Sequence, residues 1–445
     1  MPTVLLLTAL DTRGEEAAFL RTQLEARSCK VIMVDTSMRA HTRDGAEYTC
    51  AEVARQGGAD FEVISKQKGT ATITDPMMKG SISIVKRLHD EGAIDAIAGF
   101  GGATNTLFIS SIMRVLPFGF PKLILSSSAA MPAYAARYYA FKDICIFHAC
   151  LDMNGINRFV VDLLKRFAGL IAGVAGVERI QRVHDRTQIA LSEFGFSEIC
   201  AQRIRSRFQA SLNFECIPFH AQGVGDRIME EMIGDGMFDA VIDLVPAGLS
   251  EAMLGGNRSA GLDRLDIELE SGIPVIFTPC GFDALSCGPY SRRLGDLWWK
   301  EKGLLKRKLY VQDEMRVQAR TSKSEMQQIA KVFAEKLNNA KGVTLMFIPL
   351  KGFSALSVEG GPLYEPETDE AFVRTFKRHL KTRKGQLELI EMDCNIEDPE
   401  FADAILDAFG NIQYGGGMKY YSTPSPKKEK RPPRAKPLKK ERTFV

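Results

Sequence analysis

Long hydrophobic runs are missing from this 445-residue chain. No stretch of about 18 uncharged apolar residues occurs, and a helix needs roughly that length to cross a bilayer. Asp11 and Arg13 also interrupt the first apolar stretch too early for the core of a secretory signal. We therefore expect a cytoplasmic protein that has no membrane partner.

Paired cysteines and zinc motifs are missing as well. The cysteines are odd in number, and the chain contains neither a CxxC nor an HExxH motif. We expect reduced thiols that pack as small core residues, and no metal site built by the protein. A Mg²⁺ ion that accompanies a bound nucleotide is left open. The nine positions are Cys29, Cys50, Cys145, Cys150, Cys200, Cys216, Cys280, Cys287 and Cys394.

What is present is an ordinary globular composition, with 45% hydrophobic and 25% charged residues. The length suits two domains, and a polar stretch at 181–187 places their boundary, giving residues 1–184 and 185–412. Residues 413–445 form a third segment that is rich in proline. It contains ten Lys and Arg residues but only two acidic residues, Glu429 and Glu441. We expect a disordered basic tail that makes at most weak contact with nucleic acid or an acidic partner.

Short apolar runs alternate with longer amphipathic stretches along the body of the chain, which is the pattern of parallel sheets covered by helices. We predict an α/β fold with two doubly wound, mostly parallel open-sheet domains of Rossmann-like form. The expected strands of the first domain are 4–8, 30–35, 94–99, 123–127 and 144–149, with helices after Gly14, Pro76, Thr104 and Asn154. Those of the second are 188–192, 213–219, 240–245, 274–279, 343–349 and 387–392.

Ligands of such sheets bind beyond the carboxyl ends of the strands, so the loops there hold the candidate site residues. The first loop follows strand 4–8 and contains Asp11, Thr12, Arg13 and Gly14. Thr12 and Glu15 also fit a capping box, an alternative that leaves Asp11 and Arg13 unexplained.

A glycine-rich segment follows strand 94–99 and opens the next helix. Gly99, Gly101 and Gly102 let a ligand approach the backbone, whose N–H groups can hold an anion. Side-chain donors follow in Ala103-Thr104-Asn105-Thr106. The segment lacks the GK[ST] of a P-loop and the third glycine of GxGxxG, so an anion site of another kind, or a simple tight turn, is predicted.

The remaining candidates lie at comparable strand ends. Asp152 and Asn157 belong to the third such loop, where Asn154 is a candidate helix cap. In the second domain the candidate ligand-binding residues are His220, Gly223, Asp283, Lys351 and Ser354. His220 can act as an acid or base if it faces a cleft, or be structural. No catalytic residue is assigned.

At these loops the chain resembles the Tm-one-like ATP-binding domain family over residues 3–410. The resemblance is carried by LDTRGEE at Leu10, GFGG at Gly99, DMNGIN at Asp152, SAGLDRL at Ser259, LKGFSAL at Leu350 and GGPLYEPETD at Gly360. It implies two Rossmann-like subdomains, ATP binding, self-association into dimers and, in a plant member, binding of a viral replication protein. No reaction is implied.

The chain departs from that family at several polar positions. Ala103 to Thr106 replace SGGT, residues 222–226 replace TGTGG, and residues 245–248 replace a threonine-rich stretch. Gln312-Asp313 replace a His-Asn pair of the family, and residues 395–397 replace its His-Ile-Asn. We therefore expect a divergent member that binds ATP or a related nucleotide, or another anionic ligand, near the domain interface. A regulatory or partner-binding role ranks first, an enzyme acting on an acidic or phosphorylated metabolite second, and nucleic-acid binding by the tail third.

Overall fold

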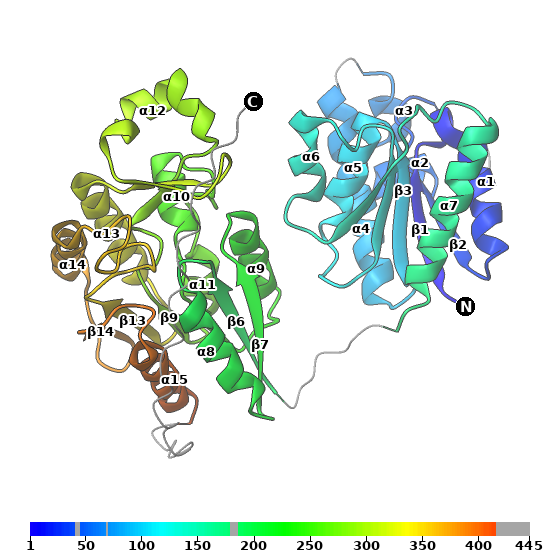
Figure 1. The fold of residues 1–445 in the computed structure, drawn as a ribbon. Helices are drawn as coiled ribbons and strands as arrows, with labels where there is room; N and C mark the ends of the chain where they lie inside the picture. Colours follow the sequence, from blue (N-terminus) through cyan, green and yellow to red (C-terminus); the bar gives the residue numbers. More distant parts are fainter. Residues whose placement is uncertain (41–44, 68–69, 179–185, 415–445) are drawn as a thin grey trace.

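A computed structural model describes residues 1–40, 45–67, 70–178 and 186–414 of the chain. It is an α/β protein with two mostly parallel sheets, each flanked by helices (Figure 1). The predicted fold class is thus confirmed. The predicted domain boundary lies within 179–185, outside the described residues, and remains a prediction, as does the tail, which is described only as far as Tyr414.

The first sheet has five parallel strands in the order β2-β1-β3-β4-β5. Residues alternate along β1: Leu5 and Leu7 pack on the side of α4 and α5, whereas Val4 and Leu6 pack on the side of α1 and α7. The strands are β1 (Thr3–Thr8), β2 (Lys30–Asp35), β3 (Ala96–Gly101), β4 (Lys122–Ser126) and β5 (Ile144–His148). The helices are α1 (Leu10–Glu25), α2 (Cys50–Gln56), α3 (Phe61–Ile64), α4 (Thr70–Asp90), α5 (Ala103–Met113), α6 (Pro132–Tyr139) and α7 (Arg158–Ala175).

The second sheet has six parallel strands in the order β14-β13-β9-β8-β6-β7. Helices α8 and α15 cover one face, and α9, α11, α13 and α14 cover the other. The strands are β6 (Thr187–Glu193), β7 (Phe214–His220), β8 (Ala240–Asp243), β9 (Val275–Phe277), β13 (Thr344–Pro349) and β14 (Leu387–Met392). The helices are α8 (Glu198–Gln209), α9 (Val224–Gly234), α10 (Gly248–Leu254), α11 (Asp266–Ser271), α13 (Lys323–Leu337), α14 (Pro366–His379) and α15 (Pro399–Tyr414).

A small antiparallel sheet, which the sequence did not predict, is not hydrogen-bonded to these two but packs on the core of the second. It has the order β10-β12-β11 and interrupts the βα alternation between β9 and α13. Its elements are β10 (Ala284–Ser286), β11 (Leu309–Val311) and β12 (Val317–Arg320), together with α12 (Leu297–Glu301) and the 3-10 helices η1 (Tyr290–Leu294) and η2 (Leu304–Lys306).

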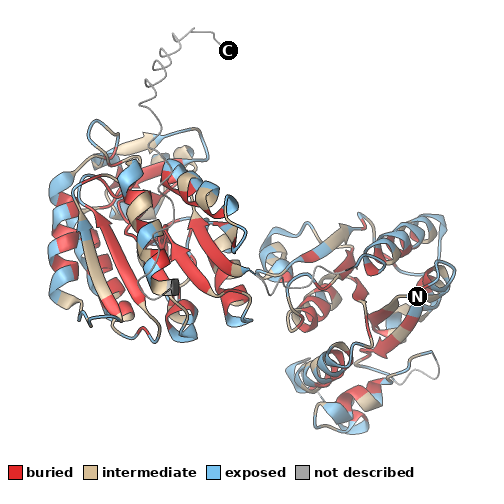
Figure 2. Cartoon of the chain, turned by 90° about the horizontal axis from the view of Figure 1, so that it is seen from below, coloured by how far each residue is buried: buried red, intermediate tan, exposed pale blue. Residues whose placement is uncertain are grey.

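Each large sheet is a buried layer, because helices cover both faces (Figure 2). In both sheets the first strand lies beside the second on one side and beside the third on the other. The chain therefore leaves β1 and β3 toward opposite faces, and does the same at β6 and β8. A crevice opens beyond the carboxyl ends of such a strand pair, and open α/β sheets bind their ligands there.

Some element bounds differ from the predicted ones. Strand β3 extends two residues further than expected, so that Gly99 and Gly101 pair within the sheet instead of forming a loop. Helix α4 begins before Pro76, at Thr70, and α7 begins at Arg158, four residues after Asn154.

Candidate functional site

A cavity of about 490 Å³, which we call the switch-point cavity, lies at the crevice between β1 and β3, where the chain leaves the two strands toward opposite faces. Three loops that are far apart in the sequence form its wall: the turn after β1, the turn after β3, and the segment between β5 and α7. Its size falls in the usual range for small-molecule sites, about 300–1,000 Å³. The lining residues are Thr12, Arg13, Gly102, Ala103, Thr104, Asn105 and Asn154, all in the N-terminal half.

The turn after β1 supplies the cavity with a cation. Arg13 has non-helical backbone angles (φ −138°, ψ 27°) within α1. Its guanidinium donates to Asn154 Oδ1 at 3.1 Å and lies 3.6 Å from a carboxylate oxygen of Asp152. The Arg13 side chain is only 16% exposed, so these contacts fix its position.

The same turn shows no capping box. Thr12 Oγ1 contacts the Ala9 carbonyl at 3.4 Å, and α1 has no side-chain cap, so the capping alternative is wrong. Asp11 is held in place instead, because its N–H donates to Ser37 Oγ at 2.9 Å and its carboxylate accepts from the N–H of Arg39.

The turn after β3 supplies backbone donors. Gly102 is the N-cap of α5 and no side chain caps this helix, so its first N–H groups face the cavity without an intrahelical acceptor. Gly101 has φ +155°, and a Cβ atom there would lie 2.6 Å from that of Asn105, so glycine is required. Thr106 is buried and hydrogen-bonds to Ser126, which secures the turn behind the cavity.

The third loop closes the site from α7. The Gly155 N–H donates to the buried carboxylate of Glu16 at 2.7 Å, which ties this loop to α1. Asn157 caps α7 by accepting from the N–H groups of Phe159 and Val160, so the cap is Asn157 and not Asn154. Asn154 is thereby available to the cavity. The sequence missed it because an asparagine before a helix is a common cap.

The candidates in the C-terminal half lie elsewhere. His220 is exposed and contacts Gln222, while Lys351 is exposed and pairs with Asp393. Gly223 has φ +80° at the start of α9. Asp283 and Ser354 are buried and hydrogen-bond to each other, close to Arg320. None of these residues lines the switch-point cavity.

The crevice between β6 and β8 is occupied by the protein itself. Arg264 is fully buried there among four carboxylates, and its Nη2 lies 2.6 Å from Asp243 Oδ2 at the end of β8. Asp226 and Glu230 lie 3.3 and 3.5 Å from the guanidinium, and Glu268 also pairs with it. Burial raises the pKa of Asp243, Glu230 and Glu268 against the opposing effect of Arg264. This cluster was not predicted from the sequence.

Within residues 1–40, 45–67, 70–178 and 186–414, no group of three or more His, Cys, Asp or Glu side chains is arranged to hold a metal ion. In the same residues, none of the helices is long and apolar enough to span a bilayer.

Family models match nearly the whole chain. The N-terminal domain of the uncharacterised protein family UPF0261 matches residues 2–179, and the C-terminal domain of that family matches residues 186–413. A UPF0261 protein of Clostridium tetani is 32% identical over 409 residues, which cover 92% of this chain and 98% of the relative.

A plant protein is also similar. The tomato mosaic virus (ToMV) resistance protein Tm-1(GCR237) of Solanum lycopersicum is 27% identical over 437 residues, covering 92% of this chain and 56% of that protein. Among solved structures, the S. aureus MnaA-UDP co-structure covers 87% of this chain and 99% of its own, at 12% identity. Its TM-score of 0.20 is too low to carry an argument.

Proposed function

The chain belongs to the uncharacterised protein family UPF0261, with relatives that include Tm-1, and we propose that it binds ATP or a related nucleotide at the switch-point cavity. The observation that carries the proposal is the joining of a helix N-terminus, a fixed arginine and two side-chain donors around one cavity at β1/β3. Backbone N–H groups at a helix start and a guanidinium are the donors that phosphate oxygens prefer.

Each donor has a distinct role in this proposal. The free N–H groups of α5 hold one phosphate, and Thr104 and Asn105 add hydroxyl and amide donors at the same end of the helix. Arg13 comes from the turn after β1, and Asn154 and Asp152 hold its guanidinium. Asp11 precedes Thr12 of the cavity wall, and Asp152 lies 3.6 Å from the Arg13 guanidinium. A Mg²⁺ ion that accompanies the nucleotide would offset the repulsion between these carboxylates and the phosphates.

We assign a regulatory or partner-binding role to this site in place of fast catalysis. Fast phosphoryl transfer needs a lysine on the phosphates, a set of magnesium ligands and a positioned base. None of the lining residues in the described part of the chain is a lysine. An enzyme acting on a small phosphorylated metabolite at the same cavity is the second candidate, because its anion donors serve either ligand.

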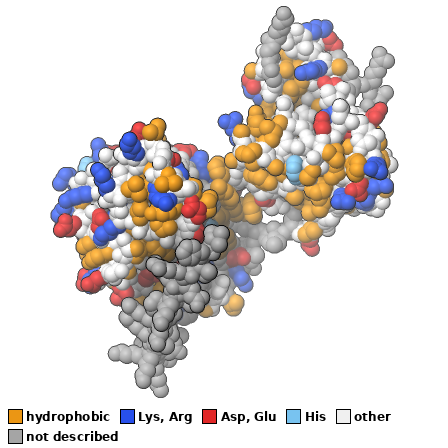
Figure 3. All heavy atoms as spheres, turned by 45° about the horizontal axis from the view of Figure 1, so that its top comes forward, with side chains coloured by type: hydrophobic (Ala, Val, Ile, Leu, Met, Phe, Trp, Pro, Cys, Tyr) orange, Lys and Arg blue, Asp and Glu red, His pale blue; other side chains and the backbone are white. Residues whose placement is uncertain are grey.

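The body of the protein offers little support for the nucleic-acid alternative. On the face that Figure 3 shows, Lys and Arg side chains lie among Asp, Glu and hydrophobic ones in both halves. This face is thus of mixed charge and not a continuous basic surface, which a phosphate backbone would require. Any binding of nucleic acid is therefore assigned to the basic tail.

The test compares Gly102→Val with Gly195→Val. A Cβ atom at Gly102 meets only Ser127 Oγ, at 3.7 Å, so valine fits the fold but projects beside the helix start. Gly195 follows β6 and also has open space, which makes it the matched control. Isothermal titration with ATP, ADP and AMP, with and without Mg²⁺, should show binding by wild type and Gly195→Val only.

Two outcomes would overturn the proposal. One is a folded Gly102→Val protein that binds nucleotide with wild-type affinity, because the site would then lie elsewhere. The other is the absence of any thermal stabilisation by nucleotides, since a ligand at 100 times its Kd stabilises the folded state by about 2.7 kcal/mol.

A further inference from the structure

The loop between β5 and α7 contains the pair Asn154-Gly155, the one place in the sequence where an asparagine is followed by glycine. Both residues are exposed, and Gly155 has φ +79°, in the left-handed region. Because glycine has no Cβ atom, its backbone nitrogen is open to close approach by the side chain before it. The nitrogen of Gly155 is therefore placed to attack the amide carbon of Asn154 and close a five-membered ring.

Two charged side chains contact the atoms that take part in this ring closure. The Gly155 N–H, which is the nucleophile, donates to Glu16 Oε1 at 2.7 Å. Arg13 Nη1 donates at 3.1 Å to Oδ1 of Asn154, the oxygen of the carbonyl under attack. Glu16 is 3% exposed, and the Arg13 side chain is 16% exposed, so packing fixes both.

This arrangement has the parts of an acyl-transfer site. A carboxylate on the N–H of a nucleophile can act as a general base, and a guanidinium on a carbonyl oxygen stabilises the negative charge that develops there. The Glu16 contact also ties the loop to α1. A neutral glutamine would accept the same hydrogen bond at a smaller cost of burial, so holding the loop does not by itself require the charge.

We propose that Asn154-Gly155 is a self-modification site, at which the folded protein accelerates its own deamidation. The Gly155 nitrogen bonds to Cγ of Asn154 while its proton passes to Glu16, and Arg13 stabilises the charge on Oδ1. The bond from Cγ to the side-chain nitrogen then breaks, and this nitrogen takes the proton back from Glu16 and leaves as ammonia. Water opens the succinimide to aspartate or isoaspartate, so the net reaction is amide hydrolysis.

The product adds a negative charge to the wall of the switch-point cavity. The new carboxylate lies at position 154, on a residue that already contacts Arg13 and lines the cavity. Arg13 then pairs with one carboxylate more, and an incoming phosphate meets added repulsion. This consequence, which rests on the proposed nucleotide site, makes deamidation an irreversible means of closing the cavity to anions.

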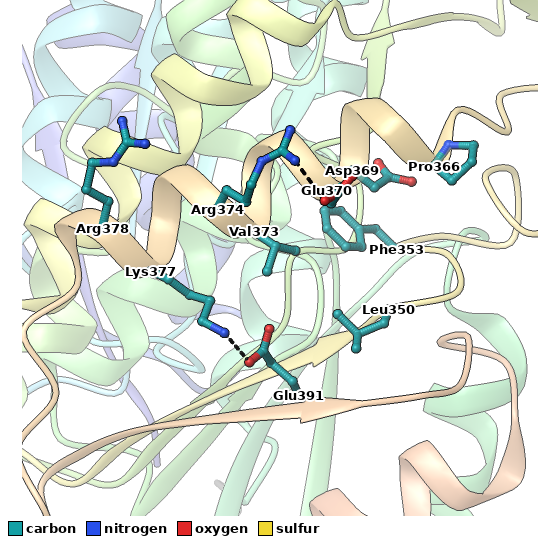
Figure 4. A pocket seen from close by; sticks show the side chains of 10 residues that line it. All are labelled: Leu350, Phe353, Pro366, Asp369, Glu370, Val373, Arg374, Lys377, Arg378 and Glu391. Carbon is teal, nitrogen blue, oxygen red and sulfur yellow. Dashed lines mark hydrogen bonds and ion pairs between the residues drawn. The ribbon is translucent and has the colours of Figure 1, made fainter.

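The change would affect this cavity and not the larger one of about 630 Å³ that lies along α14 (Figure 4). None of the described residues that line the larger cavity is an asparagine. Its charges are held in pairs, Lys377 with Glu391 at 2.6 Å and Arg374 with Glu370 at 2.8 Å. Deamidation should thus leave the charge of the α14 cavity unchanged.

The test measures the rate of conversion in the full-length protein at neutral pH and without nucleotide. Peptide mapping by mass spectrometry follows the conversion of Asn154. The reference is a synthetic peptide of residues 148–160, in which the same Asn-Gly pair lacks both Glu16 and Arg13. General acid–base catalysis contributes about 10²–10⁴-fold, so we expect the protein to react at least about tenfold faster than the peptide.

Two substitutions locate the assistance. Glu16→Gln keeps an acceptor for the Gly155 N–H and removes the base, and Arg13→Gln removes the cation on the carbonyl. We expect each to slow the conversion at least about tenfold. The matched control is Glu15→Gln, which changes the exposed neighbouring carboxylate and should leave the rate unchanged.

Three outcomes would overturn the proposal. They are the absence of conversion at Asn154, a rate in the protein no higher than in the peptide, and a folded Glu16→Gln protein that reacts as fast as wild type. Isothermal titration of Asn154→Asp with nucleotide then tests the consequence separately. Since every rate is measured without nucleotide, failure of the nucleotide site would leave the result at Asn154 standing.

Discussion

Arg264 offers a quantitative test of the structure, because it is the buried cation among Asp226, Glu230, Asp243 and Glu268. Arg264→Met keeps a long side chain and removes the charge. The four carboxylates would then lie in the interior of the C-terminal half without their shared cation.

The cost follows from the burial of the whole cluster. Removing one partner of a buried ion pair costs about 3–5 kcal/mol, since the other charge is left uncompensated. The C-terminal half is of a size for which each 1 kcal/mol lowers Tm by about 2–4 °C, so we expect its transition to fall by roughly 6–20 °C. Scanning calorimetry measures this transition.

The loss should grow with pH. A carboxyl whose pKa is raised on folding binds its proton more tightly in the folded protein, so folding is favoured at low pH and weakened as pH rises above about 4. The pKa values of Asp243, Glu230 and Glu268 are already raised in the presence of Arg264, and losing the cation raises them further. The Tm difference between variant and wild type should therefore be larger at pH 8 than at pH 5.

The control is Arg203→Met in the same half. Arg203 binds both oxygens of Asp403, but its side chain is 40% exposed, so the loss should stay within about 1 kcal/mol. The reasoning fails if Arg264→Met costs no more than this control, or if its effect on Tm is the same at pH 5 and pH 8.

Three further outcomes are expected. Arg13→Gln should weaken nucleotide binding at least about tenfold in calorimetric titration, because hydrogen bonds to charged groups contribute about 1.5–3 kcal/mol, and an unchanged Kd would remove Arg13 from the site. Steady-state turnover of Mg-ATP should stay below about 0.01 s⁻¹, against 1–100 s⁻¹ for kinases. A rate above about 1 s⁻¹ that Asp11→Asn abolishes would instead identify an enzyme. Truncation after Tyr414 should leave Tm and ligand affinity intact and remove any retention on RNA, and RNA binding that survives at physiological salt would contradict this.

Sequence reasoning located most of the switch-point cavity. It succeeded because the carboxyl ends of parallel strands meet at one edge, so polar loops that follow different strands converge whatever their separation in the chain. Thr12, Arg13 and the residues from Gly102 to Asn105 were found this way. Asn154 was interpreted as a cap, because nothing local indicates that Glu16 holds this loop and leaves Asn157 to start the helix.

The features that were missed have no local pattern. The carboxylates around Arg264 come from α9, β8 and α11, so their convergence depends on tertiary packing. The strands β10, β11 and β12 have only three or four residues each, too few for a periodicity to show.

In both halves the first strand lies between the second and the third, but the crevices beside it differ in charge. This difference predicts which half binds a nucleotide. In the first half the β1/β3 crevice is open and lined by donors, as an anion requires. In the second half the carboxylate of Asp243 lies at the β6/β8 crevice, and Arg264 is already paired with four carboxylates, so an incoming phosphate would meet negative charge there. A nucleotide should therefore bind in the first half, at the switch-point cavity.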